Sequence, residues 1–251
     1  MCAIVTPPEV SGSLSSTDEG RREAWMRSRL SESTHLAVID TTEVRWFLPG
    51  PLPPAVRHWF SGGSGFSEER RDLYLLDGRD DFGVKFRNGE TLEVKARLDT
   101  EGSGKPCGGL AGELEVWRKW VPARGPEEPS SSQRWVEVDK AIFKRRFSLD
   151  GAELEFTTGQ VEASGCDVEI VAIRVDAIRA WSYAFAAYGP PPNRCVAIGA
   201  AWRAVRSSDA SIPNELRLGR SRCMGYPEWL GRMTLPENRS GEVHRPPAST
   251  S

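Results

Sequence analysis

The stretch from Phe82 to Arg97, which reads FGVKFRNGETLEVKAR, constrains the fold more than any other part of the chain. It contains two short runs in which charged and apolar residues alternate, the period of a β-strand with two different faces. The runs are joined through Asn88-Gly89, a dipeptide typical of β-hairpin turns. The sequence therefore predicts an antiparallel hairpin. Cations stand at four alternate positions of it: Lys85, Arg87, Lys95 and Arg97.

The length of the hairpin loop decides which face these cations occupy. A two-residue loop would pair Arg87 with Glu90 and would place the cations of the two runs on opposite faces. A three-residue loop, with Gly89 in the left-handed conformation, places all four cations on one face. Only this register also gathers the apolar residues onto the other face: Val84, Phe86, Leu92, Val94 and Ala96. We therefore expect the three-residue loop and a sheet with one basic and one apolar face.

The net charge of the 251-residue chain is −2, so any basic character is local and a general nucleic-acid coat is excluded. The segment Phe143–Phe147 (FKRRF) places aromatic residues beside cations, but there is no wider basic run, and we do not expect nucleic acid as a partner. No apolar run approaches the length of a membrane span, so we expect no membrane partner. The sequence does not indicate an oligomeric state.

The five cysteines are scattered: Cys2, Cys107, Cys166, Cys195 and Cys223. They form no C-x-x-C pair and have no neighbouring histidines. An odd and scattered set suits reduced thiols better than a disulfide framework or a zinc site. The cysteine pattern therefore predicts a cytoplasmic protein.

Composition divides the chain into a flexible leader at 1–35, a β domain at 36–189 and a C-terminal extension at 190–251. In the extension, Ala197–Arg206 is a candidate helix, Pro190–Pro192 ends the regular part before it, and 236–251 is expected to be disordered. Strands are expected at Leu36–Leu48, Asp72–Leu76, Phe82–Arg97, Gly112–Trp120, Trp135–Phe147, Glu153–Thr157 and Cys166–Val175, with a short helix at Pro54–Phe60. The middle of Trp135–Phe147 could also be helical, and Ala180–Gly189 could be strand or helix. The pattern is that of a mainly β (α+β) fold with a few helices, either an antiparallel barrel or a sandwich.

Charged residues two positions apart recur on strand after strand. They include Glu43 and Arg45, Glu113 and Glu115, Lys144 and Arg146, and the single Glu169, besides the hairpin cations. The ordinary interpretation is that such residues face water. The recurrence on so many strands favours the other interpretation, a small barrel with the charges inside. Because like charges held close together cost several kcal/mol, such an interior suits a polyanion, such as a phosphate chain, with metal ions.

The order of these motifs resembles the CYTH domains, or triphosphate tunnel metalloenzymes, which are closed eight-stranded antiparallel barrels. The resemblance covers residues 40–189. The opening E-x-E-x-K strand is similar to Glu43-Val44-Arg45-Trp46-Phe47, and the strand pair that bears R-x-R is similar to Tyr74-Leu75 followed by Lys85-Phe86-Arg87. The lysine strand is similar to Leu92–Lys95, E-x-E to Glu113-Leu114-Glu115, K-x-R to Lys144-Arg145-Arg146, and the late acidic and aromatic strands to Cys166–Ile170 and Ala184–Gly189. Arg45 stands where the family has the second glutamate of its opening motif, Phe47 where it has the lysine, and Ala186 where relatives often have an acidic residue.

The resemblance implies a tunnel that grips a triphosphate, a polyphosphate or an organic triphosphate. The phosphate-binding residues it implies are Arg45, Lys85, Arg87, Lys95, Arg97, Lys144 and Arg146. The ligands it implies for Mg²⁺ or Mn²⁺ are Glu43, Glu113, Glu115 and Glu169, since hard cations prefer carboxylate oxygens. Metal-assisted attack of water on the terminal phosphate would follow, although no catalytic residue can be named.

Two other functions stay open. One is a polyanion-binding tunnel without turnover, because Arg45 would place a positive charge where a metal ion would sit. The other is a lipocalin-like barrel whose apolar face points inward around a hydrophobic ligand. The barrels predict opposite directions for the same residues: if Val84, Phe86 and Val94 line the interior, the tunnel interpretation is wrong.

Overall fold

The computed structural model describes residues 36–63, 65–101, 107–110, 112–122, 132–156, 163–207, 213–216 and 223–234. All of them belong to one compact unit, Leu36–Ser251. The predicted leader at 1–35 and the predicted disordered end at 236–251 lie outside the described residues.

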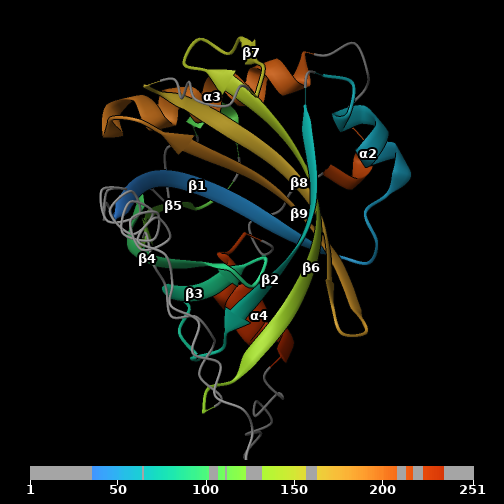
Figure 1. The fold of residues 1–251 in the computed structure, drawn as a ribbon. Coiled ribbons are helices and arrows are strands. Elements are labelled where there is room, and N and C mark those ends of the chain that lie inside the picture. The colour runs from blue at the N-terminus through green and yellow to red at the C-terminus, as the bar shows by residue number, and fades with distance from the viewer. Residues whose placement is uncertain are drawn as a thin grey trace, which may run out of the picture. The chain divides into compact units, whose positions relative to one another are not determined.

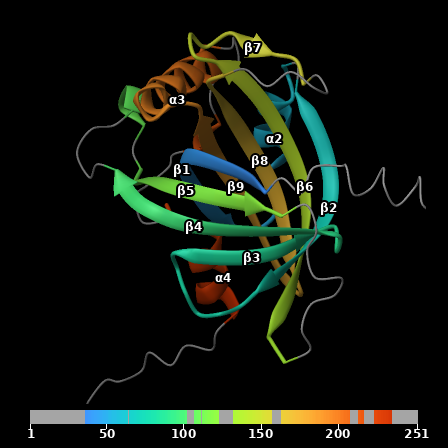
Figure 2. The same cartoon turned by 60° about the vertical axis from the view of Figure 1, so that its left-hand side comes forward.

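Nine antiparallel strands form one sheet, and eight of them close into a barrel (Figures 1 and 2). The strands are β1 (Ala37–Pro49), β2 (Phe66–Leu75), β3 (Phe82–Arg87), β4 (Thr91–Glu101), β5 (Leu114–Val121), β6 (Trp135–Ser148), β7 (Glu153–Leu154), β8 (Gly165–Val175) and β9 (Ile178–Tyr188). The sheet order is β2-β3-β4-β5-β1-β9-β8-β6-β7, and an additional pairing of β2 with β6 closes the ring. The short β7 pairs only with the end of β6. The fold is thus the predicted closed antiparallel eight-stranded barrel.

The hairpin of β3 and β4 has the predicted register. Arg87 pairs with Thr91, which leaves a loop of three residues between them, Asn88 to Glu90. Gly89 has the left-handed φ of +74°, and Asn88 also has a positive φ, of 52°. Asparagine tolerates this conformation better than most residues do, which explains the choice of Asn-Gly here. The four hairpin cations consequently share one face, as predicted.

Two helices cover the apolar outer face of the barrel. These are α2 (Pro54–Phe60) and α3 (Pro191–Arg206), and both begin with proline, whose fixed φ suits the first turn. The outer core joins β1, β8 and β9 to both helices through Trp46, Ile170, Phe185, Trp59 and Ile198. Burial of these large apolar side chains outside the barrel leaves the other face of the strands for its interior.

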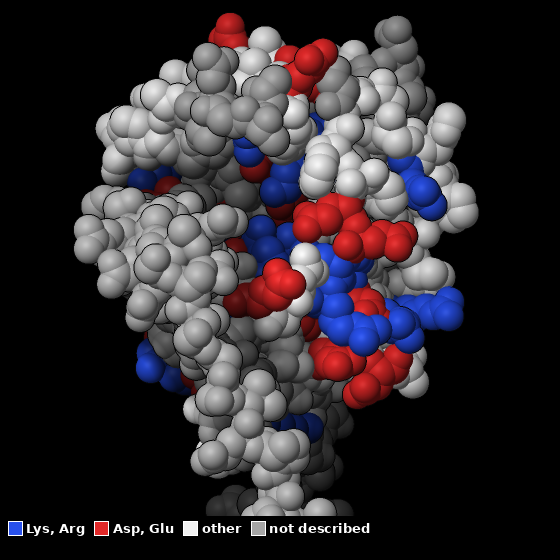
Figure 3. All heavy atoms as spheres, in the orientation of Figure 1, with Lys and Arg blue, Asp and Glu red and all other residues white. Residues whose placement is uncertain are grey.

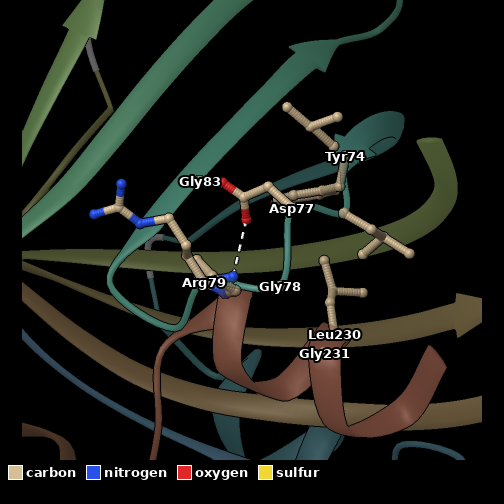
Figure 4. Close-up of a pocket in the computed structure, with 10 residues that line it drawn as sticks. Tyr74, Asp77, Gly78, Arg79, Gly83, Leu230 and Gly231 are labelled. Atoms are coloured by element: carbon tan, nitrogen blue, oxygen red, sulfur yellow. Dashed lines mark hydrogen bonds between the residues drawn. The ribbon is translucent and has the colours of Figure 1, made fainter. Parts of the chain in front are cut away.

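A third helix, α4 (Tyr226–Thr234), lies at the opposite end of the barrel from α3 (Figures 1 and 2). Its Trp229 stacks on Phe47 of β1 at 4.6 Å between ring centroids. Leu230 and Gly231 lie against the turn Asp77–Arg79, where the backbone N–H of Arg79 donates to Asp77 (Figure 4). This end of the interior is therefore filled by an apolar cluster.

Several element boundaries differ from the sequence prediction. β2 begins at Phe66 because its first six residues (FSEERR) pair with β6 despite their polarity. β6 is strand throughout, and β9 is a strand. The proposed strand at Glu153–Thr157 shrinks to two residues, and Thr157 lies outside the described residues. The prolines expected to end the regular part instead start α3, which is six residues longer than predicted.

The expectation that all cysteines are reduced is wrong. Cys107, in the short 3-10 helix η1 (Cys107–Gly109), forms a disulfide with Cys195 of α3 across a sequence separation of 88 residues. Gly108 permits this close approach, since a Cβ there would lie 2.6 Å from the Cα of Gly199. Cys166 and Cys223 are free. The sequence does not indicate this pairing, because the two cysteines are far apart in the chain and only the folded structure places η1 next to α3.

Within the part of the chain that the structure describes, no helix is long and apolar enough to cross a membrane.

Candidate functional site: the charged lumen

The face of the strands that carries the charged residues is the inner face of the barrel. Ion pairs join strands that are not neighbours: Lys95 of β4 reaches Glu43 of β1 across β5, and Arg45 of β1 reaches Glu169 of β8 across β9. Such contacts form on the concave side of a closed sheet. Phe86 packs on the other side, with its ring 5.4 Å from that of Trp135. The charges therefore face inward, and the lipocalin-like arrangement is wrong.

Asp72 of β2 is the most buried charge of this lumen, with no exposed side-chain surface. Its Oδ2 accepts hydrogen bonds from Lys140 at 2.7 Å and from Lys85 at 3.2 Å. Arg70 lies 3.2 Å from its Oδ1. Lys140 also donates to the Tyr74 hydroxyl at 2.6 Å, and its ammonium lies 4.3 Å from the centre of the Tyr226 ring. One carboxylate thus holds three cations beside the helix α4.

Arg45 lies deep in the lumen, between β1, β8 and β9. Its guanidinium donates to Ser182 at 3.0 Å and to Glu169 at 3.1 Å, and it lies over the Tyr226 ring. Lys144 binds the other oxygen of Glu169 at 2.6 Å. Each oxygen of the Glu169 carboxylate is therefore bound by one cation.

Glu43 and Glu115 are direct cross-strand neighbours on β1 and β5. Lys95 donates to both oxygens of Glu43, at 2.6 and 2.7 Å. Arg97 and the indole N–H of Trp117 hold Glu115, at 2.5 and 2.9 Å. Each glutamate of the pair is therefore neutralised by a cation from β4.

The lumen brings together all seven residues that the sequence analysis assigned to phosphate binding. Lys85 and Arg87 both bind Glu93, at 2.9 Å each, and Arg146 binds Asp167 at 2.7 Å. Of the four predicted metal ligands, Glu113 lies apart, exposed and immediately before β5. Figure 3 shows cations and carboxylates intermingled over one face of the molecule. In the lumen, the counter-ions of the cations are carboxylates of the chain itself.

Sequence reasoning missed several charged residues that line the same lumen. They are Glu68, Arg70, Asp72, Glu93, Lys119, Lys140 and Asp167. A signal was present for Lys119, which continues the alternation of Glu115 and Trp117 along β5. The strand prediction for β2 started too late to show that Arg70 and Asp72 share one face.

FKRRF, the segment considered for nucleic acid, is split between the two faces of β6. Lys144 and Arg146 point into the lumen, whereas Phe143 and Phe147 join the outer core. The aromatic and basic side chains therefore do not form one surface.

Ion pairing displaces the pKa of the lumen carboxylates. Burial alone would raise the pKa of Glu93, but the charges of Lys85 and Arg87 outweigh it and lower the pKa to about 2. Lys144 and Arg45 likewise outweigh the burial of Glu169 and hold its pKa well below the usual range. Glu115 differs, because burial raises its pKa more than its hydrogen bonds to Trp117 and Arg97 lower it. Most of the network therefore exists as ion pairs at neutral pH.

We predict that acid destabilises the protein through these carboxylates. A depressed pKa contributes stability above the unfolded-state value and loses it as the pH falls through the folded-state value. For Glu93 the window runs from 4.5 down to about 2, and its contribution is about 3 kcal/mol. Urea unfolding at a series of pH values measures this loss.

The control for the acid experiment is Glu137, which lies on the outer face and is 65% exposed. Glu93→Gln should flatten the decline of stability between pH 4.5 and 2, whereas Glu137→Gln should leave it unchanged. Equal pH profiles for the two variants would contradict the assignment.

The predicted metal ligands do not fit a divalent cation as they stand. Glu43, Glu115 and Glu169 each have their oxygens bound by side-chain cations or by an indole N–H. Among the residues that the structure describes, no three of His, Cys, Asp and Glu are grouped so as to hold a metal ion. Arg45 adds a fixed positive charge between the acidic strands, which a Mg²⁺ ion would have to approach. The assignment of Glu43, Glu113, Glu115 and Glu169 to Mg²⁺ or Mn²⁺ stays a prediction that the ion pairs do not favour.

No protein-family model and no curated protein matches the chain. Among solved structures, it is similar to the S. pombe Pct1 RNA triphosphatase, with a TM-score of 0.33 and 7% identity over 81% of this chain and 94% of that one. It is also similar to the same triphosphatase in complex with the Spt5 CTD, with a TM-score of 0.31 and 7% identity over 80% and 90% of the chains. TM-scores and identities this low do not support any function for this chain.

Proposed function

We propose that the barrel lumen binds a phosphate chain, such as inorganic tripolyphosphate or the triphosphate of an organic molecule. The observation that carries this proposal is an excess of positive charge on inward-facing strand positions. The cations among the described residues are Arg45, Arg70, Lys85, Arg87, Lys95, Arg97, Lys119, Lys140, Lys144 and Arg146. The carboxylates are Glu43, Glu68, Asp72, Glu93, Glu115, Asp167 and Glu169. Ten cations thus face seven carboxylates.

This excess is held where water screens charge poorly. The side chains of Arg45, Lys85 and Lys140 are 12, 15 and 3% exposed. Buried cations without full compensation raise the free energy of the empty barrel, and an anion that enters relieves that cost. Guanidinium groups suit bidentate contacts with phosphate oxygens, and ammonium groups act as compact point charges. A multiply charged anion therefore matches the lumen better than a neutral or apolar ligand.

Binding through the lumen cations requires no metal ion. Metal-dependent hydrolysis, which the family resemblance implies, would require the glutamates to exchange their cations for Mg²⁺ or Mn²⁺. A screen for phosphate release from tripolyphosphate and nucleoside triphosphates, with each metal, separates an enzyme from a binding module.

We predict that tripolyphosphate raises the unfolding temperature. At a concentration 100 times the dissociation constant, a ligand stabilises the folded state by about 2.7 kcal/mol, which for a domain of this size is a shift of roughly 5 to 10 °C. Sulfate at equal ionic strength should shift it much less, because it offers fewer charges to the lumen. Differential scanning fluorimetry measures both.

A pair of variants locates the effect. Arg87→Gln removes a lumen cation and should reduce the shift, whereas Arg174→Gln removes a cation that binds Asp139 on the outer face and should preserve it. An unchanged unfolding temperature in wild type with tripolyphosphate would refute binding.

We infer further that the chain is a divergent relative of the CYTH domains. The support is that the charged motifs quoted for the resemblance face the lumen of a closed eight-stranded barrel, with the exception of Glu113. The closest alternative is a lumen that holds an acidic segment of a partner protein. A peptide with several aspartates, used in the same thermal assay, tests that alternative.

A cytoplasmic location stays a proposal. The cysteines no longer support it, because the location was inferred from the expectation that all of them are reduced. Disulfides persist mainly in oxidising compartments, and Cys107–Cys195 is such a bond. Fractionation of cells that express the full chain would decide the compartment.

A further inference from the structure

A groove on the outer face of the barrel is separate from the lumen. It crosses β2, β6, β8 and β9 beside the loop at Pro51 and Leu52, and its volume is about 750 Å³. Figures 1 and 2 show α2 and the tip of the β8–β9 hairpin at opposite ends of this stretch of sheet, and none of the described helices covers the strands between them. Small-molecule sites typically have roughly 300 to 1,000 Å³, so the groove is large enough for a small ligand.

The floor of the groove is low and apolar because two small residues meet there. Ala141 of β6 lies directly opposite Ala172 of β8. In the next outward-facing pair along the same two strands, the residues are Phe143 and Ile170, which pack in the outer core. Leu52, which also packs against the outer core, lines one side. The groove therefore exists because alanines stand where the neighbouring part of the sheet has large side chains.

A row of charged residues crosses the groove from β2 to β9. Its members are direct cross-strand neighbours in the order Arg71, Asp139, Arg174 and Arg179. Arg71 and Arg174 both bind the carboxylate of Asp139. Arg174 and Arg179 stand side by side, and like charges directly opposite one another destabilise a sheet. A carboxylate bound between these two arginines would relieve the repulsion, as Asp139 does between Arg71 and Arg174.

The guanidinium group of Arg179 is available for a ligand. Arg179 is exposed and has no ion-pair partner in the part of the chain that the structure describes. Asp176, in the turn of the hairpin, is also exposed, and within the described ranges it pairs with neither arginine. Glu69, the other carboxylate that lines the groove, is on β2, three strands from β9, which corresponds to about 14 Å. The Arg174 side chain is 58% exposed, so its bond to Asp139 can be shared with a ligand at little cost.

We propose that this groove binds a carboxylic acid with a short apolar body, the chemistry of a medium-chain fatty acid or an aromatic acid. The carboxylate lies between Arg174 and Arg179, whose planar guanidinium groups suit bidentate contacts with carboxylate oxygens. The apolar body covers Ala141 and Ala172. A phosphate chain has no apolar part to cover this floor, so the groove and the lumen take different ligands. The site does not depend on the proposed function.

Isothermal titration of the full-length protein with octanoate tests the proposal. We expect saturable binding of one octanoate per chain. Butanoate has four methylene groups fewer and should bind at least about tenfold more weakly, because it buries less apolar surface. 1-Octanol has the same apolar body without the charge and should also bind about tenfold more weakly.

Three variants locate the binding. Arg179→Gln should weaken octanoate binding about tenfold, and Ala172→Leu should weaken it because the larger side chain fills the floor. Arg118→Gln is the control for charge, since Arg118 binds Asp40 on the outer face of β1 and β5, away from the groove, and should leave the affinity unchanged. The unfolding temperature of each variant without ligand excludes misfolding. For Arg179→Gln it should equal that of wild type or exceed it, because the repulsion with Arg174 is removed.

Four outcomes would overturn the proposal. They are the absence of octanoate binding, binding that neither Arg179→Gln nor Ala172→Leu weakens, binding of 1-octanol as strong as that of octanoate, and competition by tripolyphosphate, which would place octanoate in the lumen. Sedimentation equilibrium adds a fifth: if wild type is a dimer that Ala172→Leu dissociates, a second copy of the chain occupies the groove. Failure of octanoate to bind leaves the phosphate-binding lumen untouched, since tripolyphosphate tests that site separately.

Discussion

Replacement of Asp72 by asparagine should destabilise the protein by about 3–5 kcal/mol, because it leaves buried cations without a counter-charge. Asp72 is fully buried and binds Lys140 and Lys85, with Arg70 beside it. The loss would be a large fraction of the 5–15 kcal/mol that stabilises a typical domain. Urea-induced unfolding of the variant and wild type measures it.

The double variant Asp72→Leu with Lys140→Met tests the cause of this loss. Replacement of a buried ion pair by apolar residues is often close to neutral, so the double variant should regain part of the stability that Asp72→Leu alone loses. Asp139→Asn is the matched control, since Asp139 binds Arg71 and Arg174 on the exposed outer face and should contribute at most about 1 kcal/mol. Equal losses of stability for Asp72→Asn and Asp139→Asn would contradict the claim that the buried ion pairs of Asp72 stabilise the barrel.

Loss of the Cys107–Cys195 disulfide should have an effect of similar size. The bond closes a loop with a sequence separation of 88 residues, for which the chain-entropy account gives about 4–5 kcal/mol and measured bonds typically give 2–5 kcal/mol. Cys195→Ser should therefore lower the unfolding temperature by roughly 5 to 20 °C. Thermal unfolding with and without reductant measures the effect.

The free thiol of Cys223 provides the control for the disulfide. Reductant should lower the stability of wild type and of Cys223→Ser by the same amount, and it should have no effect on Cys195→Ser. A wild-type protein that is indifferent to reductant would show that the bond does not contribute to stability.

Alternation along the strands predicts the register of the hairpin and the common face of its cations, whereas the choice of a closed barrel over a sandwich rests on the recurrence of charged pairs and on the family resemblance. The period of two places Lys85 and Lys95 on one face once the loop is known to have three residues. The same period does not indicate which carboxylate each cation contacts, because the stagger between strands of a barrel cannot be derived from the sequence of one strand. Lys95 therefore reaches Glu43 over an intervening strand, a contact that no local pattern indicates.

Other features could not be predicted because their local sequence has no pattern typical of the structure that forms. The first half of β2 is too polar to be recognised as a strand, so the sequence does not indicate that Asp72 contacts Lys140. The helix α4 has only nine residues, and its buried Trp229 and Leu230 pack in one cluster with Phe47 and Tyr74, which are distant in the sequence. The disulfide depends on the packing of η1 against α3. These features arise from tertiary contacts, which overrule local propensity.

The central claim is that the lumen binds a phosphate chain through its own excess of cations. Calorimetric titration of the full chain with tripolyphosphate, once in EDTA and once in Mg²⁺, tests it most directly. We predict saturable binding in EDTA at one ligand per chain, with an affinity that falls as salt is added, because the attraction is electrostatic. The absence of binding in EDTA together with binding in Mg²⁺ would contradict the account, since the carboxylates would then have to exchange their cations for the metal.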